Sequence, residues 1–380
     1  MADGRETHGI SRVGIFAPSL GDGGVERMLI NLAGGFNKLG LTVSLACATD
    51  SPPYLDRTSA SPLLQIWHLG RTAPIRDEAE RWLRHTGCDV TLSAKDRDCR
   101  ILLEARNRSR LPIPVIYRCG TDLRARLAGR SAFRRWRERR RVRQLLGGVD
   151  GVTGNSVGVC NSMDAFGALT PSRLIRNPVI TDALLEATSR PPRHPWLRQK
   201  AGPVIVAVGR LASVKDFPTL LEAFAMLPRE MGARLIILGE GRCRQRLESL
   251  TRSLGLEDTV SMPGFTADPY PEVAASDALI VSSRREGSPN ALIEAMALGV
   301  PVAATDCPSG PAEILDQGRW GPLVPVGDPH ALHLAIRQIL DRPVPTERLR
   351  EAVSDYREEA SAEAYLDFFR SLQSHFTPGH

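Results

Sequence analysis

The sequence has no apolar run that approaches the roughly 18–20 residues needed to span a bilayer. Residues 1–9 are polar and lack the hydrophobic stretch of a secretory signal, so we expect a cytoplasmic protein. Cysteine is sparse, with neither a Cys-x-x-Cys pair nor an accompanying histidine cluster. The seven cysteines are residues 47, 88, 99, 119, 160, 243 and 307. Their odd number and scattered positions favour reduced thiols over disulfides or a zinc site.

The 380-residue chain is too long for one hydrophobic core and suits two domains of similar size. Its apolar content of 42% and charged content of 24% are ordinary for a soluble globular protein. The charge is unevenly placed, because residues 1–180 hold 28 Lys and Arg against 17 Asp and Glu. Residues 181–380 hold 21 against 26. The basic first half predicts an anionic partner for the N-terminal domain.

Strand and helix patterns alternate through both halves. In the first half, short apolar runs predict strands at 12–17, 42–48, 90–93, 115–118 and 151–154. In the second half, they predict strands at 203–208, 234–238, 260–262, 278–281 and 301–304. Helical spacing fills much of the sequence between them. This alternation predicts an α/β fold with two Rossmann-like domains, each built on a parallel sheet, that face a cleft.

The polar, proline-rich segment 189–195 predicts a linker between these domains. We therefore expect an N-terminal domain over 1–188 and a C-terminal domain over 189–350. A helix from about residue 351 to 376, within the segment 351–380, is expected to pack across both domains.

Residues 277–315 hold the most informative motif of the chain. The apolar strand 278–281 ends in a polar turn, and a helix is expected to begin near Pro289. Glu286 lies in the turn and Glu294 in the helix. Backbone N–H groups at a helix N-terminus stabilise phosphate or sugar oxygens, so this layout predicts a nucleotide-sugar site. The alternative is that both glutamates are merely exposed carboxylates beside a helix.

A second candidate site follows the apolar strand 203–208, where Gly209, Arg210 and Lys215 lie in one turn. Ligands of doubly wound sheets bind beyond the carboxyl ends of the strands. The two cations there would neutralise a diphosphate and stabilise it as it leaves. A solvated turn with two surface cations is the alternative.

These two motifs resemble the signatures of retaining GT-B glycosyltransferases of the family 4 type, the group 1 transferases with a Glu-x7-Glu motif. The resemblance implies that Glu286, Arg210 and Lys215 are catalytic, with Glu286 contacting the donor sugar and the two cations holding its diphosphate. It implies that Glu294 holds the ribose. The donor-binding residues that it implies are Gly23, Gly24, Gly209, Glu240, Phe265, Gly287, Ser288, Asn290, Ala291 and Glu294. Residues 307–315 resemble a bacterial branch that builds lipopolysaccharide, exopolysaccharide or lipid-linked glycans, commonly from UDP-sugars.

Three of these assignments come from weaker motifs. The glycine loop 21–24 precedes a helix and, in the family, faces the donor across the cleft; by itself it also fits a tight turn. Glu240 lies in a Gly-x-Gly turn that the family places near the nucleotide, but a plain strand-to-helix turn explains it as well. Phe265 lies in a segment that the family places near the base.

Residues 118–143 hold eleven arginines, opposed only by Asp122 and Glu138. Phe133 and Trp136 can share one helix face, so an amphipathic segment at an anionic membrane surface is predicted. The acceptor or membrane contacts that we predict are Arg118, Asp122, Arg134, Arg135, Trp136, Arg139 and Arg140. A solvated basic helix is the alternative. Nucleic acid is not an expected partner, because no nucleic-acid-binding module appears.

The resemblance is incomplete in the N-terminal domain. Many relatives carry a histidine after a strand there, and it contacts the donor sugar near its reacting carbon. The corresponding segment, 115–122, has no histidine. Asp122 and Arg118 are candidates for this contact, and His68 and His85 are weaker ones.

We predict a metal-independent retaining glycosyltransferase without a cofactor, whose substrates are a nucleotide-sugar donor and a lipid-linked or glycan acceptor. It is expected at the cytoplasmic face of the inner membrane as a peripheral protein. No Asp-x-Asp metal motif appears on the site strands, so basic residues would take the place of the cation. Two alternatives remain open. One is a nucleotide-sugar epimerase or hydrolase of the same fold, and the other is a non-catalytic partner of a membrane glycosyltransferase.

Overall fold

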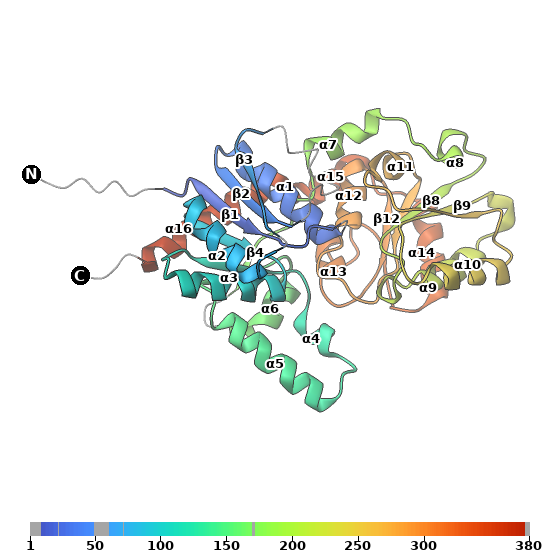
Figure 1. Cartoon of the computed structure of the whole chain (residues 1–380). Coiled ribbons are helices and arrows are strands. Elements are labelled where there is room, and N and C mark those ends of the chain that lie inside the picture. The colour runs from blue at the N-terminus through green and yellow to red at the C-terminus, as the bar shows by residue number, and fades with distance from the viewer. Residues whose placement is uncertain (1–8, 22, 49–60, 71, 169–171, 377–380) are drawn as a thin grey trace, which may run out of the picture. The chain divides into compact units, whose positions relative to one another are not determined.

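The computed structural model describes residues 9–21, 23–48, 61–70, 72–168 and 172–376 (Figure 1). The chain folds into two compact units. The first contains Met1–Pro178 and Glu358–His380, and the second contains Val179–Arg357. Each unit is built on a parallel sheet with helices packed against it, which confirms the predicted α/β class and its two Rossmann-like domains.

The parallel sheet of the first unit has the strand order β3-β2-β1-β4-β5-β6-β7. Its strands are β1 (Arg12–Phe16), β2 (Thr42–Cys47), β3 (Leu64–His68), β4 (Val90–Ser93), β5 (Val115–Cys119), β6 (Gly151–Gly154) and β7 (Arg173–Leu174). Its helices are α1 (Gly24–Lys38), α2 (Ile75–Thr86), α3 (Asp96–Ser109), α4 (Leu123–Leu127), α5 (Ala132–Leu146), α6 (Val157–Asp164) and α16 (Glu358–Phe376). The strand order reverses between β1 and β4, which makes their carboxyl ends the topological switch point of this sheet.

The second unit repeats this plan, with the strand order β10-β9-β8-β11-β12-β13. Its strands are β8 (Val204–Val208), β9 (Arg234–Leu238), β10 (Val260–Gly264), β11 (Ala278–Val281), β12 (Val302–Thr305) and β13 (Leu323–Val324). Its helices are α7 (Asp182–Leu185), α8 (Pro195–Arg198), α9 (Phe217–Ala225), α10 (Arg244–Ser253), α11 (Tyr270–Ala274), α12 (Asn290–Leu298), α13 (Pro311–Ile314), α14 (Pro329–Asp341) and α15 (Thr346–Ala352). Short 3-10 turns lie at Glu186–Ser189, Ser213–Lys215, Arg229–Met231 and Ser354–Tyr356. Here the switch point lies between β8 and β11.

The central strands of the second unit are apolar along almost their whole length because helices cover both faces of the sheet. Val206 on β8 pairs with Ile236 on β9 and with Leu279 on β11, and all three side chains are fully buried. These strands fix the positions of the loops at their carboxyl ends.

The C-terminal helix α16 belongs to the first unit, where it packs against α1. Phe36 on α1 contacts Tyr365 and Phe369 on α16, with ring centroids 6.2 and 5.9 Å apart. A Cβ atom at Gly35 would lie 2.5 Å from the carbonyl oxygen of Glu358, so only glycine permits this close approach. The predicted start of this helix near residue 351 was wrong, because a 3-10 turn separates α15 from α16.

The predicted domain boundary at residues 188/189 was also wrong. The chain leaves the first unit at Pro178 and returns at Glu358. Val179 and Ile180 already belong to the second unit, since both of their N–H groups donate to the carbonyl oxygen of Tyr356 and their side chains lie in its core. The proline-rich segment 189–195 therefore lies inside the second unit and leads into α8.

Candidate functional site

Two loops meet at the switch point of the second unit. Lys215 follows β8 and Glu286 follows β11, and these strands are neighbours in the sheet. The Lys215 Nζ donates to Glu286 Oε1 at 2.7 Å, although the residues lie 71 positions apart in the sequence. The structure thus brings together two of the three residues predicted to be catalytic.

Hydroxyl groups hold this ion pair in place. Ser283 Oγ donates to the same Glu286 Oε1 at 2.6 Å, and Thr305 Oγ1 donates to the carbonyl oxygen of Ser283 at 2.5 Å. Ser282 Oγ donates to the carbonyl oxygen of Lys215 at 2.8 Å. Sequence reasoning assigned no role to these hydroxyls, although Ser283 stands three residues before Glu286 in the signature. Ser283 therefore orients the Glu286 carboxylate, whereas Ser282 and Thr305 hold the backbone of the two loops.

A second ion pair ties the two loops together on the outside. The guanidinium of Arg284 lies 3.0 Å from the carboxylate of Asp216, and the Arg284 N–H donates to the Val214 carbonyl oxygen at 2.8 Å. Asp216 is buried, and its backbone adopts the left-handed conformation with φ of 50°. Its carboxylate also accepts a hydrogen bond from Thr219 Oγ1 at 2.9 Å. A non-glycine residue in this conformation costs free energy, and such strain concentrates at functional loops.

The two glutamates of the signature are not exposed. The Glu286 side chain is 14% exposed, and Glu294 on α12 is 1% exposed. This excludes the alternative of two solvated carboxylates beside a helix. Ser288 Oγ is buried and has no hydrogen-bond partner among the residues that the structure describes. Buried hydroxyls are normally paired, so this loop has capacity for a ligand.

The first turn of α12 completes the loop. The helix begins at Asn290, as predicted, and its N-cap residue Pro289 provides no side-chain cap. Ala291 lies in this first turn and Gly287 is buried in the loop before it. Backbone N–H groups at such a helix start bind anionic oxygens.

Cys307 and Gly310 pack the next loop against the signature. Burial, with a further contribution from the Glu286 carboxylate, raises the pKa of the Cys307 thiol to about 12. Gly310 has φ of 77°, and a Cβ atom there would lie 2.8 Å from the Gly287 carbonyl oxygen. This segment therefore supports the signature loop and contributes an inert thiol rather than a nucleophile.

The other predicted donor residues of the second unit lie at carboxyl ends of its strands. Arg210 is exposed, and its guanidinium makes no ion pair or hydrogen bond with any residue that the structure describes. A Cβ atom at Gly209 would lie 3.1 Å from Lys215 Cε. Phe265, just after β10, is 46% exposed.

Glu240 follows β9 and is held by Arg244. The Arg244 Nη2 and Nε donate to its carboxylate at 2.7 to 2.9 Å, and these hydrogen bonds lower the pKa of Glu240. Sequence reasoning missed Arg244, which also donates to the Met262 carbonyl oxygen at 3.1 Å. Glu240 is therefore a fixed anion at this edge of the sheet.

The predicted basic surface is present on α5. Arg134, Arg135, Trp136, Arg139 and Arg140 are all exposed. Only Val142, Leu145 and Leu146 of this helix are buried, so its first ten residues extend away from the sheet (Figure 1).

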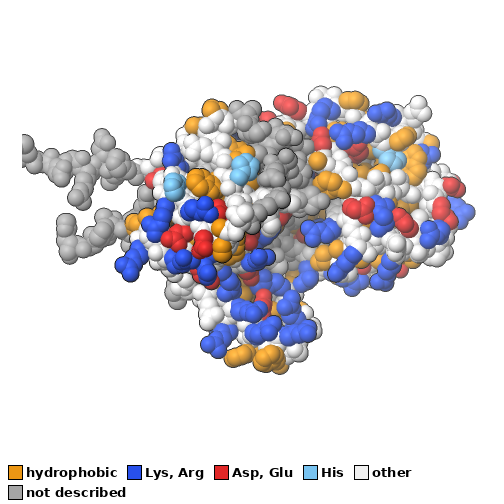
Figure 2. All heavy atoms as spheres, in the orientation of Figure 1, with side chains coloured by type: hydrophobic (Ala, Val, Ile, Leu, Met, Phe, Trp, Pro, Cys, Tyr) orange, Lys and Arg blue, Asp and Glu red, His pale blue; other side chains and the backbone are white. Residues whose placement is uncertain are grey.

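Two aromatic rings lie among the exposed arginines of α5. Phe133 is 67% exposed and Trp136 57%, and the two rings stack with centroids 6.1 Å apart. The Arg140 guanidinium lies over Trp136, 6.0 Å from the ring centroid. Figure 2 shows basic side chains gathered over this helix, with a hydrophobic group at its tip.

Arg118 and Asp122 are not part of that surface. Arg118 is 3% exposed, and its guanidinium donates to Asn177 Oδ1 inside the first unit. The prediction that it contacts an acceptor or membrane was wrong, because every residue of β5 is buried. Asp122 Oδ1 accepts hydrogen bonds from the N–H groups of Arg124 and Ala125 at 2.8 and 3.0 Å and so caps α4. Its position has a structural explanation.

The glycine loop of the first unit leads into α1. Gly24 is the first residue of α1 and Gly23 its N-cap, without a side-chain cap. Asp22 lies outside the described residues. The helix therefore begins at the loop, as predicted.

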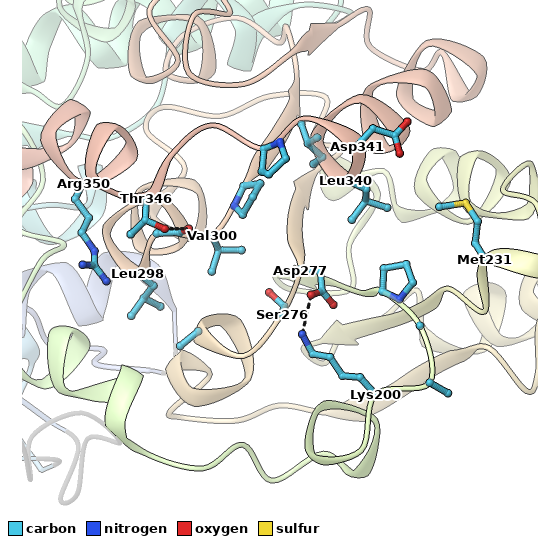
Figure 3. Close-up of a pocket in the computed structure, with 18 residues that line it drawn as sticks. Lys200, Met231, Ser276, Asp277, Leu298, Val300, Leu340, Asp341, Thr346 and Arg350 are labelled. Atoms are coloured by element: carbon cyan, nitrogen blue, oxygen red, sulfur yellow. Dashed lines mark hydrogen bonds and ion pairs between the residues drawn. The ribbon is translucent and has the colours of Figure 1, made fainter.

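A large pocket lies elsewhere in the second unit, with a volume of about 890 Å³ (Figure 3). Pro203, Asp277 and Pro301, which line it, immediately precede β8, β11 and β12, so the pocket opens at the amino ends of these strands. Lys200 Nζ donates to Asp277 Oδ1 there at 2.8 Å. The pocket lies at the opposite edge of the sheet from Lys215 and is not the predicted donor site.

Among the described residues, none of the helices has the length and apolar character required to cross a membrane.

Comparison with known proteins agrees with the sequence motifs. The chain is 35% identical to the lipopolysaccharide core biosynthesis glycosyltransferase LpsE of Rhizobium meliloti, over 44% of this chain and 50% of that protein. It thus spans about half the length of that relative. It is 27% identical to an N-acetylgalactosaminyltransferase of Campylobacter jejuni, over 93% of this chain and 95% of that protein.

The fold is also that of solved glycosyltransferase structures. The structure of Anabaena HepE in complex with UDP and glucose superposes with a TM-score of 0.78 and 19% identity, covering 95% of this chain and 100% of that chain. Residues 192–359 match the family described as glycosyl transferases group 1, and residues 22–183 match glycosyltransferase family 4. The chain therefore belongs to the group 1, family 4 type glycosyltransferases of GT-B fold.

Proposed function

We propose that the protein is a retaining glycosyltransferase that uses a nucleotide-diphosphate sugar, with UDP as the nucleotide. Its acceptor is a lipid-linked or polysaccharide glycan of the bacterial cell surface. The observation that carries this proposal is the Lys215–Glu286 pair at the switch point of the second unit, 2.7 Å apart and locked by Ser283. A mobile surface pair would not be fixed in this way.

The site fits the charges that develop during glycosyl transfer. As the bond between sugar and diphosphate breaks, positive charge grows on the sugar and negative charge on the leaving group. Lys215, the exposed Arg210 and the N-terminus of α12 provide the positive groups that stabilise the diphosphate. These cations supply the charge that a metal ion supplies in other folds, and we propose that the reaction needs neither a metal nor a cofactor.

Glu286 orients the donor sugar in this proposal and does not attack it. Its Oε1 already accepts hydrogen bonds from Lys215 and Ser283, which lowers its nucleophilicity. We assign no enzymic nucleophile; the departing phosphate takes the proton of the acceptor hydroxyl. Glu294 holds the ribose, Glu240 lies near the nucleotide and Phe265 is a neighbour of the base.

The relatives support the donor and the acceptor. The HepE structure holds UDP and glucose. The Campylobacter relative is named for a diphospho-undecaprenol acceptor and an α-linked product. Common UDP-sugars carry an α-linked diphosphate, so an α-linked product means retention. LpsE is named for lipopolysaccharide core synthesis.

We also propose that α5 holds the enzyme at the anionic cytoplasmic face of the inner membrane. Its exposed arginines surround the stacked Phe133 and Trp136, the combination that binds an interface through charge and buried apolar area. Each basic residue near an anionic surface contributes about 1 kcal/mol. A solvated helix would gain nothing from exposing two aromatic rings.

The catalytic proposal is tested by nucleotide release from UDP- and GDP-sugars, with and without a lipid extract of the source membranes. Lipid-dependent release from one UDP-sugar is expected, with an α-linked product, no change on adding EDTA, and loss in Glu286→Ala and Lys215→Ala. Release that ignores the lipid would favour an epimerase or hydrolase. No release and no donor binding would favour a non-catalytic partner subunit.

The membrane proposal is tested by sedimentation with vesicles. The protein is expected to bind phosphatidylglycerol vesicles and not phosphatidylcholine vesicles, and to be released by salt. The double variant Phe133→Ser/Trp136→Ser should bind at least tenfold more weakly. Arg337→Ala on α14 of the second unit is the control. Equal binding by the double variant and the wild type would refute a role for the aromatic pair.

A further inference from the structure

The β4–α3 turn of the first unit contacts the segments before and after the glycine loop, at the switch point of that sheet. β1 ends at Phe16 and β4 at Ser93, and Ser93 Oγ donates to the Phe16 carbonyl oxygen at 3.0 Å. The glycine loop follows β1, and the turn that contains Lys95 follows β4. Substrates of doubly wound sheets bind at this edge.

Lys95 connects the segments on both sides of the glycine loop. Its Nζ donates to the Ser19 carbonyl oxygen at 2.9 Å and to Ser19 Oγ at 3.2 Å, before the loop. It also donates to Glu26 Oε1 at 2.6 Å, in the first turn of α1. The three donor hydrogens of one ammonium thus all have acceptors within the protein, so Lys95 acts through the loop rather than on a substrate.

Asp96, the next residue, makes the corresponding connection to the basic helix. Its Oδ2 accepts from Arg126 Nη1 on α4 at 3.0 Å, and Arg126 Nη2 donates to Glu138 Oε1 on α5 at 3.1 Å. The Tyr117 hydroxyl donates to Asp96 Oδ1 from β5. The carboxylate of Asp96 therefore fixes α4 and, through Arg126, α5.

The second unit shows the same arrangement at its own switch point. There the Lys215 Nζ lies 2.7 Å from Glu286 Oε1, and in the first unit the Lys95 Nζ lies 2.6 Å from Glu26 Oε1. The two charges exchange places between the units. In the second unit the lysine follows the first strand of the pair (β8), whereas in the first unit it follows the second strand (β4). Both sheets thus carry a Lys–Glu pair where ligands are expected.

We infer that the β4–α3 turn is a positioning element for glycosyl transfer, in which Lys95 fixes the segments that flank the glycine loop and Asp96 fixes α4 and, through Arg126, α5. This inference rests on the proposed function of the protein. Reacting groups held within a few tenths of an ångström lose less entropy on binding, and a displacement of about 1 Å costs up to about a hundredfold in rate. The turn would hold the segments around the glycine loop and the proposed membrane-binding helix α5 from one point.

Amide hydrogen exchange on the full-length chain tests the two connections separately. Lys95→Met should speed exchange at least tenfold in the peptides covering residues 18–30, with the α4–α5 peptides unchanged. Asp96→Asn should do the reverse. The control is Lys38→Met, because Lys38 pairs with Glu358 and Glu359 at 2.7 Å, at the other end of α1. It should change neither segment.

Kinetics then separates positioning from stability. Lys95→Met should lower kcat/KM for transfer by ten- to a hundredfold and leave the Kd for UDP within twofold, because the proposed nucleotide ligands lie in the second unit. Lys95→Arg should restore most of the activity. Lys38→Met should remain within twofold of the wild type.

Two results would overturn the inference. One is unchanged exchange over residues 18–30 in Lys95→Met, and the other is faster exchange in both segments in both variants, which would indicate general destabilisation. If the wild type transfers no sugar, the proposed function fails. The exchange experiment still decides whether the turn holds the two segments, so the two failures are distinguishable.

Discussion

Replacing Lys215 by methionine removes the cation of the switch-point pair while keeping most of the side-chain volume. The side chains of Lys215 and Glu286 are 26% and 14% exposed, so this ion pair is intermediate between an exposed and a buried one. An exposed pair contributes less than about 1 kcal/mol to stability, whereas disruption of a buried pair costs about 3–5 kcal/mol. We expect the free energy of unfolding to fall by about 1–2 kcal/mol, because Ser283 still donates to Glu286. Loss of one group that stabilises a developing anion costs about a hundred- to a thousandfold in kcat. The effect on catalysis should therefore exceed the effect on stability.

The assay measures nucleotide release under saturating donor, beside urea unfolding of the same preparations. The matched control is Lys200→Met in the same unit, where Lys200 pairs with Asp277 at 2.8 Å at the amino ends of the strands. This control should keep kcat within twofold and lose less than about 1 kcal/mol of stability. A folded Lys215→Met enzyme that retains kcat within threefold of the wild type would refute the role assigned to this cation.

Three further predictions concern thiols, pH and backbone strain. Under native conditions, a thiol reagent should modify the partly exposed Cys243 before the buried Cys307, whose pKa of about 12 keeps it protonated; mass spectrometry of labelled peptides checks this, and equal rates would contradict it. Burial lowers the pKa of His194, whose neutral ring accepts the Trp196 N–H at Nδ1 over 3.2 Å. The contribution of His194 to stability is therefore present above the unfolded pKa of about 6.5 and is lost as the pH falls below that value. The difference in thermal midpoint between the wild type and His194→Gln should therefore shrink from pH 7.5 to pH 5, and a difference that grows would show the opposite sign. Gly310→Ala should destabilise the protein by about 1–3 kcal/mol in urea unfolding, because φ is 77° and the new methyl group meets a backbone carbonyl; an unchanged midpoint would show that the loop adapts.

Continuous apolar runs made much of the sheet structure predictable. Strands such as 234–238 and 278–281 were predicted at their observed bounds, because buried parallel strands are apolar on both faces. β3 was not predicted, since this edge strand, Leu64–His68, is only partly buried and mixes polar with apolar residues. β7 and β13 have two residues each and leave no periodic signal.

The members of the site were more predictable than their contacts. Glu286 and Lys215 stand in recognisable motifs, but their pairing depends on β8 lying beside β11, and strand order is not written in local sequence. Arg118 shows the reverse difficulty. Its place within an arginine-rich stretch suggested a surface cation, whereas its position on a fully buried strand decides its environment.

The path of the chain has a consequence for how the protein can be divided. Because residues 179–357 leave and rejoin the first unit at Pro178 and Glu358, the second unit is an insertion within the first. A gene fragment that stops before α16 removes Tyr365 and Phe369, which pack against Phe36 on α1. The first unit therefore loses part of its core, although α16 lies far from the N-terminal sheet in the sequence. The second unit is contiguous and can be produced from one reading frame. The first requires its two segments to be fused directly or expressed together.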